Sequence, residues 1–153
     1  MISNRSDWKA GLSMLIIACV KEFRTTLTDG EAIAQLDLGC YPWHGLLELS
    51  ALTEREANDP NCTHPGEAAS WKYYNFAASL PSWTCASELG AQMKDLYYKS
   101  DANRSELIND FLRVCAEAMT EPAAAAAIQT LNSKNPVRVS VIHPDTGKDF
   151  SVR

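Results

Sequence analysis

The sequence lacks a long hydrophobic run, an excess of basic residues and a paired-cysteine motif. The apolar stretch at residues 12–20 is too short to cross a bilayer, which takes about 20 apolar residues. Lys and Arg number 14 against 19 Asp and Glu, which gives a net charge of -5 and disfavours a surface for nucleic acid. We therefore expect a cytoplasmic protein with neither a membrane nor a nucleic acid as its partner.

The five cysteines give an odd count, and no CxxC pair occurs among them. Such cysteines are typical of reduced thiols in a cytosolic chain. The sequence also lacks GxSxG, HExxH, P-loop and GxGxxG motifs, so we assign no catalytic residue and expect no cofactor. At 153 residues, with 46% hydrophobic and 22% charged residues, the chain is of a size and composition that predict a single domain over residues 1–153.

The N-terminal segment allows two interpretations. Ile16-Ile17-Ala18-Cys19 resembles a lipobox, so a lipoprotein anchored at Cys19 is the alternative location for the protein. Apolar residues nevertheless recur at three- and four-residue spacing through Cys19 from Trp8 to Leu27. This unbroken stripe favours an amphipathic helix that begins after Ser6 and ends near Leu27.

A β-hairpin is predicted over residues 31–52. Apolar and polar residues alternate on both sides of the loop at residues 39–45, which is typical of two strands with one buried face. Leu38 and Leu49 then point to the core, while Asp37 and Glu48 lie on the opposite face. These two carboxylates can form an acid/base pair, but acids on the outer face of an antiparallel hairpin are normally solvated.

The remaining pattern predicts a mixture of helices and strands. The expected elements are a surface loop over residues 54–70, a strand from Trp71 to Phe76, a helix carrying Ala86 to Tyr97, a helix after Asn103 with Glu106 as its capping-box partner, a helix from Pro122 to Leu131, and a closing hairpin of Val137–Val141 with Phe150 and Val152. This order does not alternate as a doubly wound fold requires. We predict an α+β fold, with helices packed on one face of a mainly antiparallel sheet.

Aromatic side chains concentrate between residues 41 and 83. Most are expected to pack in the core, because aromatic rings dominate burial in small sheets. Trp and Tyr also supply large contact areas at protein interfaces. We therefore predict a binding surface for another protein, with a basic partner suited to the acidic chain. Its candidate residues are Tyr41, Trp43, His44, Glu48, Trp71, Tyr73 and Tyr74.

An enzyme that depends on a metal ion or a thiol is the alternative function. Cys40, His44, Cys62 and His64 together have the ligand composition of a tetrahedral zinc site. Each half of this set mixes the two residue types, whereas compact zinc motifs pair cysteine with cysteine and histidine with histidine. A reactive Cys40 or Cys62 would also need a nearby base and a lowered thiol pKa.

The layout of the chain resembles a group of known domains. A long N-terminal helix is followed by a strand with "LDLG", a strand running into "LTEREA", the segment "SWKYYNF", paired helices and a closing "VSVIHPDTG". This order resembles small bacterial domains found near the polymorphic-toxin immunity families. The resemblance implies a cytosolic, non-enzymatic domain that binds another protein, such as a toxin, and it transfers no catalytic residues.

Overall fold

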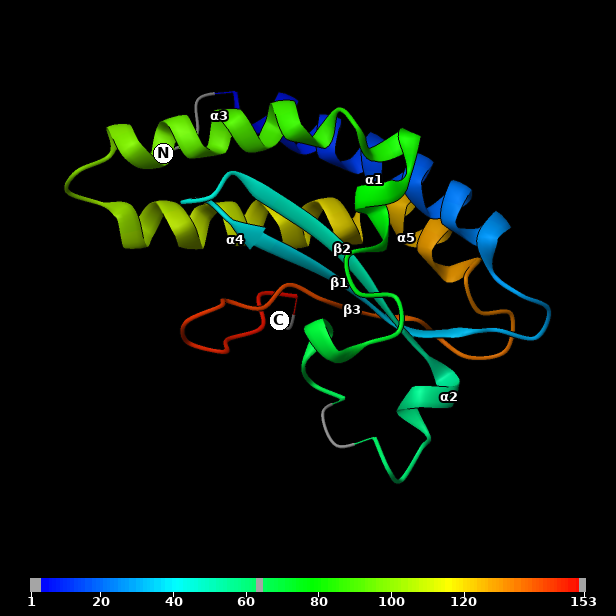
Figure 1. Cartoon of the computed structure of the whole chain (residues 1–153). Helices are drawn as coiled ribbons and strands as arrows, with labels where there is room; N and C mark the ends of the chain where they lie inside the picture. Colours follow the sequence, from blue (N-terminus) through cyan, green and yellow to red (C-terminus); the bar gives the residue numbers. More distant parts are fainter. Residues whose placement is uncertain (1–3, 63–64, 152–153) are drawn as a thin grey trace.

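The structure is a computed structural model that describes residues 4–62 and 65–151. Its elements are α1 (Arg5–Thr26), β1 (Ile33–Tyr41), β2 (Leu46–Thr53), α2 (Glu54–Ala57), the 3-10 helices η1 (Ala68–Ser70), η2 (Phe76–Ser79) and η3 (Pro81–Trp83), α3 (Ala86–Lys99), α4 (Arg104–Thr120), α5 (Pro122–Gln129) and β3 (Arg138–Ser140). The helix α1 contacts α3, α4 and α5, and Figure 1 shows these helices close together. The predicted α+β class is confirmed.

The sheet is mixed, so the prediction of a mainly antiparallel sheet is wrong. Within the described residues, three strands pair in the order β2–β1–β3, with β2 antiparallel and β3 parallel to β1. The chain leaves α5 near the start of β1, where the Ile33 amide donates to the Leu131 carbonyl at 3.1 Å. It then runs along β1 in the same direction, which makes β3 parallel (Figure 1).

The predicted hairpin is present, and its register separates two faces. Leu38 pairs with Leu49, while Asp37 pairs with Ser50 and Gly39 with Glu48. Because side chains alternate along a strand, the leucines share one face and the polar residues share the other. We call the latter the polar face; it consists of Gln35, Asp37, Gly39, Tyr41, Glu48 and Ser50.

The leucine face of the hairpin belongs to a hydrophobic core that it shares with the helices. The apolar residues that recur at three- and four-residue spacing along α4 are buried: Leu107, Ile108, Phe111, Leu112, Cys115, Ala118 and Met119. Trp8 and Phe23 mark the two ends of the buried stripe of α1. Cys19 lies between them at 0% exposure, so its thiol is inaccessible in the folded chain.

Three expected strands or caps differ from the structure. Tyr73 makes a single bridge to Ala51 instead of a strand, because the chain turns at Asn75 (φ +49°) into η2. The closing hairpin is reduced to one bridge between Ile142 and Asp149, and Val152 lies outside the described residues. Asn103 begins α4 without a side-chain cap bond.

The segment 54–70 is not wholly irregular, since it contains α2 and η1. A capping box lies at the start of α2. Thr53 Oγ1 accepts from the Glu56 amide at 3.1 Å, and Glu56 Oε2 accepts from the Thr53 amide at 3.0 Å. This reciprocal pair satisfies amides that the helix start leaves without partners.

Candidate functional site

A pocket of about 370 Å³ lies on the polar face of the sheet. Its lining residues are Asp37, Gly39, Tyr41, Glu48, Ser50, Gly66, Glu67, Ala68, Ala69, Trp71, Tyr74, Ile142 and Pro144. They come from β1 and β2, from the segment around η1, and from the turn after β3. Among the described residues, no lysine, arginine or histidine lines it. The pocket therefore combines carboxyl and aromatic groups without a described basic side chain.

Asp37 lies on the floor of this pocket and is 9% exposed. Its Oδ1 atom accepts a hydrogen bond of 2.6 Å from Ser140 Oγ on β3. Burial raises the pKa of Asp37 to about 6, the Ser140 bond opposes the rise, and the negative charge of Asp149 adds to it. The prediction that Asp37 is solvated is wrong, because Ser140 on the neighbouring strand β3 contacts it, and the segment around η1 and the turn after β3 border the same pocket.

Glu48 lies diagonally across the strands from Asp37. Its Oε2 atom is buried, and no hydrogen-bond partner reaches it from the described residues. A hydrogen bond to Glu48 raises the pKa of the Tyr74 hydroxyl. Burial, followed by the charge of Glu48, raises the pKa of Tyr41 to about 12. Since buried carboxylate oxygens normally have a donor, Glu48 Oε2 is a vacant acceptor.

Gly39 makes room for the Tyr41 ring on the polar face. A Cβ atom at Gly39 would lie 3.0 Å from Tyr41 Cε2, which is tighter than ordinary van der Waals contact. The ring of Tyr41 can therefore fold back over the strand because residue 39 has no side chain. The glycine of "LDLG" thus shapes the pocket floor.

The wall that carries Trp71 and Tyr74 is fixed by contacts on both of its sides. Trp71 Nε1 donates to the Pro65 carbonyl at 3.2 Å. The Asn75 amide donates to Ser50 Oγ at 2.8 Å, which ties the end of the segment to β2. This segment is held to the sheet although it forms no strand.

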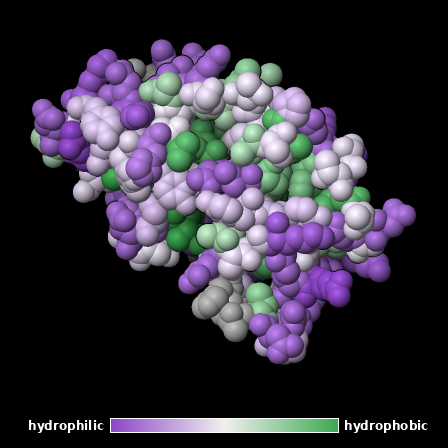
Figure 2. Space-filling view, in the orientation of Figure 1, coloured by the Kyte–Doolittle hydropathy of each residue, from purple (hydrophilic) through white to green (hydrophobic). Residues whose placement is uncertain are grey.

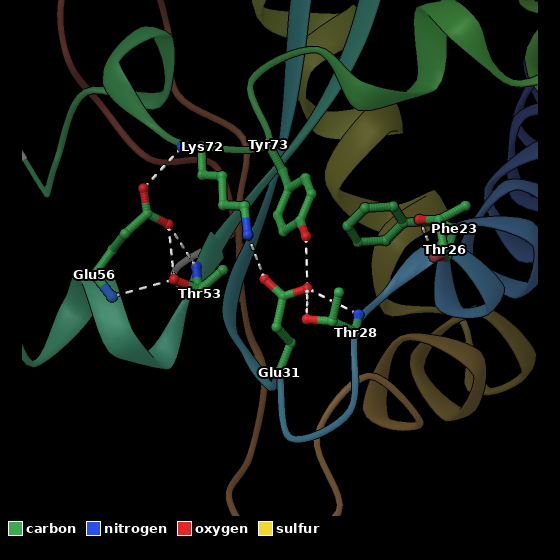
Figure 3. Close-up of polar contacts among 8 residues, drawn as sticks. All are labelled: Phe23, Thr26, Thr28, Glu31, Thr53, Glu56, Lys72 and Tyr73. Atoms are coloured by element: carbon green, nitrogen blue, oxygen red, sulfur yellow. Dashed lines mark hydrogen bonds and ion pairs between the residues drawn. The ribbon is translucent and has the colours of Figure 1, made fainter.

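Glu31 and Glu56 hold the middle of the same segment (Figure 3). Tyr73 Oη donates to Glu31 Oε1 at 2.6 Å, and Lys72 Nζ lies 2.8 Å from Glu31 Oε2. The Lys72 amide donates to Glu56 Oε1 at 2.7 Å. The bonds from Lys72 and Tyr73, together with two from Thr28, lower the pKa of Glu31 to about 2. Glu31 is therefore ionised throughout the physiological range.

The structure brings together four of the predicted binding residues. Tyr41, Glu48, Trp71 and Tyr74 all line the pocket. Tyr73 lies behind the wall, where its ring meets Phe23 edge-on at 5.1 Å.

Trp43 and His44 are not in the pocket. They occupy the turn between β1 and β2, where the Trp43 ring lies 6.3 Å from the ring of Tyr97. The side chain of His44 is exposed. These two residues were grouped with the other candidate binding residues because they are close in the sequence. They lie beyond the end of β1, away from the pocket.

One of the four residues of the alternative metal or thiol site, Cys40, is buried in the hydrophobic core. Cys40 is 1% exposed on the leucine face, and its Sγ atom lies 3.5 Å from Met93 Sδ. Cys62 is half-buried in the loop after α2, and His64 lies outside the described residues. Among the described residues, no three His, Cys, Asp or Glu side chains are placed to hold a metal ion.

Residues from the C-terminal quarter complete the site, and no sequence pattern indicated that they would. Ser140 reaches Asp37 only because β3 pairs parallel with β1, and Ile142 and Pro144 follow it along the rim. The pairing Asp37–Ser50 was available from the hairpin pattern. The parallel pairing of β3 with β1 was not, since a short run of alternating residues does not indicate its partner strand.

Comparisons of the chain with protein-family models, curated proteins and solved structures gave no match. Within the described part of the chain, no helix combines the length and apolar character needed to cross a membrane. The chemistry of the pocket is therefore the basis for a functional proposal.

Proposed function

We propose that the chain is a non-enzymatic binding domain that holds a basic segment of another protein at the polar-face pocket. One lysine or arginine side chain of the partner enters the pocket and donates to Glu48. The observation that carries this proposal is the buried Glu48 Oε2 atom, which has no donor among the described residues. A charged donor from a partner protein would satisfy this acceptor with a strong hydrogen bond.

The aromatic lining supports the same type of ligand. Trp71, Tyr74 and Tyr41 supply ring surfaces for the hydrocarbon part of a long basic side chain. A cation within about 6 Å of a ring centroid gains roughly 0.5–2 kcal/mol from the ring quadrupole. Tyr74 is 45% exposed, so it is accessible to an incoming partner.

The charge of the whole chain favours the same class of partner. The net charge of -5 attracts a basic protein at long range and raises the rate of encounter. Figure 2 shows a mainly hydrophilic surface on the displayed face, with apolar side chains in hollows near its middle. A basic toxin would be one such partner, as the resemblance in layout implies.

The test measures the binding of the full chain to a fluorescein-labelled peptide that has one lysine and one arginine among glycines and serines. Fluorescence anisotropy gives the affinity for the wild type, for Glu48→Gln and for Glu106→Gln. Glu106 is exposed on α4, so Glu106→Gln makes the same change of charge away from the pocket. We expect Glu48→Gln to weaken binding at least tenfold, because a neutral amide replaces the charged carboxylate.

The control variant distinguishes specific binding at the pocket from non-specific attraction between the acidic chain and the basic peptide. Glu106→Gln should change the affinity by less than about twofold, since a single exposed charge is screened at 0.15 M salt. Equal losses in the two variants would overturn the proposal and indicate non-specific attraction. Both variants should unfold at the same urea concentration as the wild type, so that altered folding does not explain a loss.

A further inference from the structure

The polar-face pocket brings the carboxyl groups of Asp37 and Glu48 together, and no described lysine, arginine or histidine lines it. Asp37 pairs with Ser50, and Glu48 pairs with Gly39, so the two acids occupy diagonal positions on neighbouring strands. Diagonal partners on an antiparallel pair are about 7–8 Å apart at their Cα atoms. Both side chains belong to the polar face and line the same pocket.

The groups around Asp37 do not supply a direct positive charge. Ser140 on β3 donates to it, Tyr41 on β1 lies along the same face, and Asp149 in the C-terminal turn adds a negative charge. Ser50 and Glu48 face it from β2, and Glu67 from the segment around η1 lines the same pocket.

The nearest described route from Asp37 to a basic residue is indirect. Arg138 donates to Gln35 Oε1 at 3.0 Å, and Gln35 Nε2 donates to Ser140 Oγ at 2.9 Å. Ser140 then donates its own proton to Asp37 at 2.6 Å. Two side chains therefore separate the guanidinium from the carboxyl group. Arg138 orients Ser140 but does not form an ion pair with Asp37.

We propose that the pocket binds an organic cation, an ammonium or guanidinium group, in exchange for the proton of Asp37. This inference rests on the proposed function, because it takes a basic side chain as the ligand. Below pH 6, Asp37 in the empty pocket is mainly a neutral carboxylic acid. When the cation enters, the O–H bond of Asp37 breaks, the proton passes to the solvent, and the carboxylates of Asp37 and Glu48 share the incoming charge.

The exchange makes affinity depend on pH in a defined direction. The pKa of Asp37 in the empty chain is raised to about 6, so the group is mostly protonated at pH 5 and ionised at pH 8. Lysine and arginine stay charged over this range. The affinity for the cation therefore rises with pH, because at high pH Asp37 has already lost the proton that binding would otherwise have to displace. A pKa near 6 corresponds to an increase of about tenfold between pH 5 and pH 8.

Isothermal titration calorimetry of the full chain tests this exchange. The probes are Nα-acetyl-lysine methylamide, its uncharged analogue Nα-acetyl-norleucine methylamide, and n-butylamine. Titrations at pH 6 in two buffers with different ionisation heats count the protons released on binding. We expect the lysine derivative to bind at least ten times more tightly than the norleucine derivative and to release about half a proton per cation.

The variant Asp37→Asn tests the release of the proton separately from the binding of the cation, because asparagine has no proton to release in this pH range. It should bind the lysine derivative with an affinity that changes less than twofold between pH 5 and pH 8, and it should release no proton. Glu48→Gln should lower the affinity at both pH values. A wild-type affinity that does not change with pH, or that changes equally in Asp37→Asn, would overturn the exchange.

The outcomes distinguish this inference from the proposed function. If the basic peptide binds and Glu48→Gln weakens it, but the wild type shows no pH dependence, only the proton exchange is wrong. If n-butylamine binds more tightly than the lysine derivative and the peptide does not bind, the pocket accepts a free amine. That result would support the cation site and overturn recognition of a protein.

Discussion

Tyr73 and Glu31, 42 positions apart in the sequence, are joined by a hydrogen bond of 2.6 Å from the phenol to the carboxylate. Glu31 lies just before β1, whereas Tyr73 belongs to the segment that forms one wall of the pocket (Figure 3). The bond fixes the wall relative to the strand that carries Asp37. The pocket therefore depends on a residue that does not line it.

Glu31→Ala should destabilise the chain and weaken binding at the pocket. The substitution removes the acceptor for Tyr73 Oη, Lys72 Nζ, and the amide and hydroxyl of Thr28. We expect the free energy of unfolding to fall by about 2 kcal/mol, as measured by urea denaturation. Lys72→Met is the control, since the Lys72 side chain is 57% exposed and its ion pair, screened by solvent, should contribute little to stability. Equal losses in the two variants would contradict a dominant role for the Tyr73 bond.

Asp37→Asn should stabilise the empty chain at pH 7. The native pKa of about 6 lies above the value of about 3.9 in an unfolded chain, so the native state binds the proton more tightly. The contribution of Asp37 to stability is therefore present below pH 4 and is lost as the pH rises through 6. The asparagine variant lacks this loss, and we expect it to gain on the order of 2 kcal/mol at pH 7 and nothing at pH 4.

Urea denaturation at a series of pH values checks this expectation. Asp101→Asn is a matched control, because the Asp101 side chain is 95% exposed and should show a difference within about 0.5 kcal/mol at every pH. A wild type that gains stability relative to Asp37→Asn between pH 4 and pH 6 would show that Asp37 is stabilised in its charged form. That outcome would also remove the basis for the proton exchange.

Much of the fold was predictable where the hydrophobic pattern of a single segment indicates its secondary structure. The stripe of α4 and the alternation of β1 and β2 each identify a buried face without reference to any other segment. The sheet type was not predictable in this way. The pairing of Arg138–Ser140 with β1 depends on where α5 ends, and this is a property of the packed chain.

The site was only partly predictable for the same reason. The hairpin pattern placed Asp37 and Glu48 on one face, and composition selected Trp71 and Tyr74. Burial of Asp37 could not be inferred, because Ser140, which contacts it from the neighbouring strand, lies 103 positions away. Composition also selected residues in the turn between β1 and β2 that the structure places away from the pocket.

The five thiols should fall into two classes of reactivity. Cys85 is exposed and Cys62 half-buried, whereas Cys19, Cys40 and Cys115 are buried. Burial raises the pKa of Cys19 to about 12 and that of Cys115 well above its ordinary value, so neither forms a thiolate at neutral pH. A chromogenic disulfide reagent should modify Cys62 and Cys85 in the native chain. The other three should react only in denaturant.

Mass spectrometry of the modified protein assigns the reactive positions, and Cys85→Ser should remove the fastest of them. Rapid modification of Cys40 in the native state would contradict its place in the core. It would also revive the alternative of a thiol-dependent enzyme, because a nucleophilic cysteine must be accessible as the thiolate.

The turn between β1 and β2 packs against α3 through two glycines, and this contact gives a test of the fold. A Cβ atom on Gly90 would overlap the carbonyl oxygen of Gly45, whose φ of +66° is itself strained for other residues. Gly90→Ala should therefore lower the free energy of unfolding by about 2–3 kcal/mol, although alanine is the better helix former by about 1 kcal/mol.

Gly11→Ala is the matched control for this last prediction. Gly11 lies within α1, and its nearest contact for an added Cβ is Leu89 Cδ2 at an ordinary 3.8 Å. With no overlap, the helix preference of alanine should dominate and raise stability by about 0.5–1 kcal/mol. Urea denaturation of both variants gives opposite signs if the turn meets α3 as described. A stabilising Gly90→Ala would show that the turn is separated from the helix in solution.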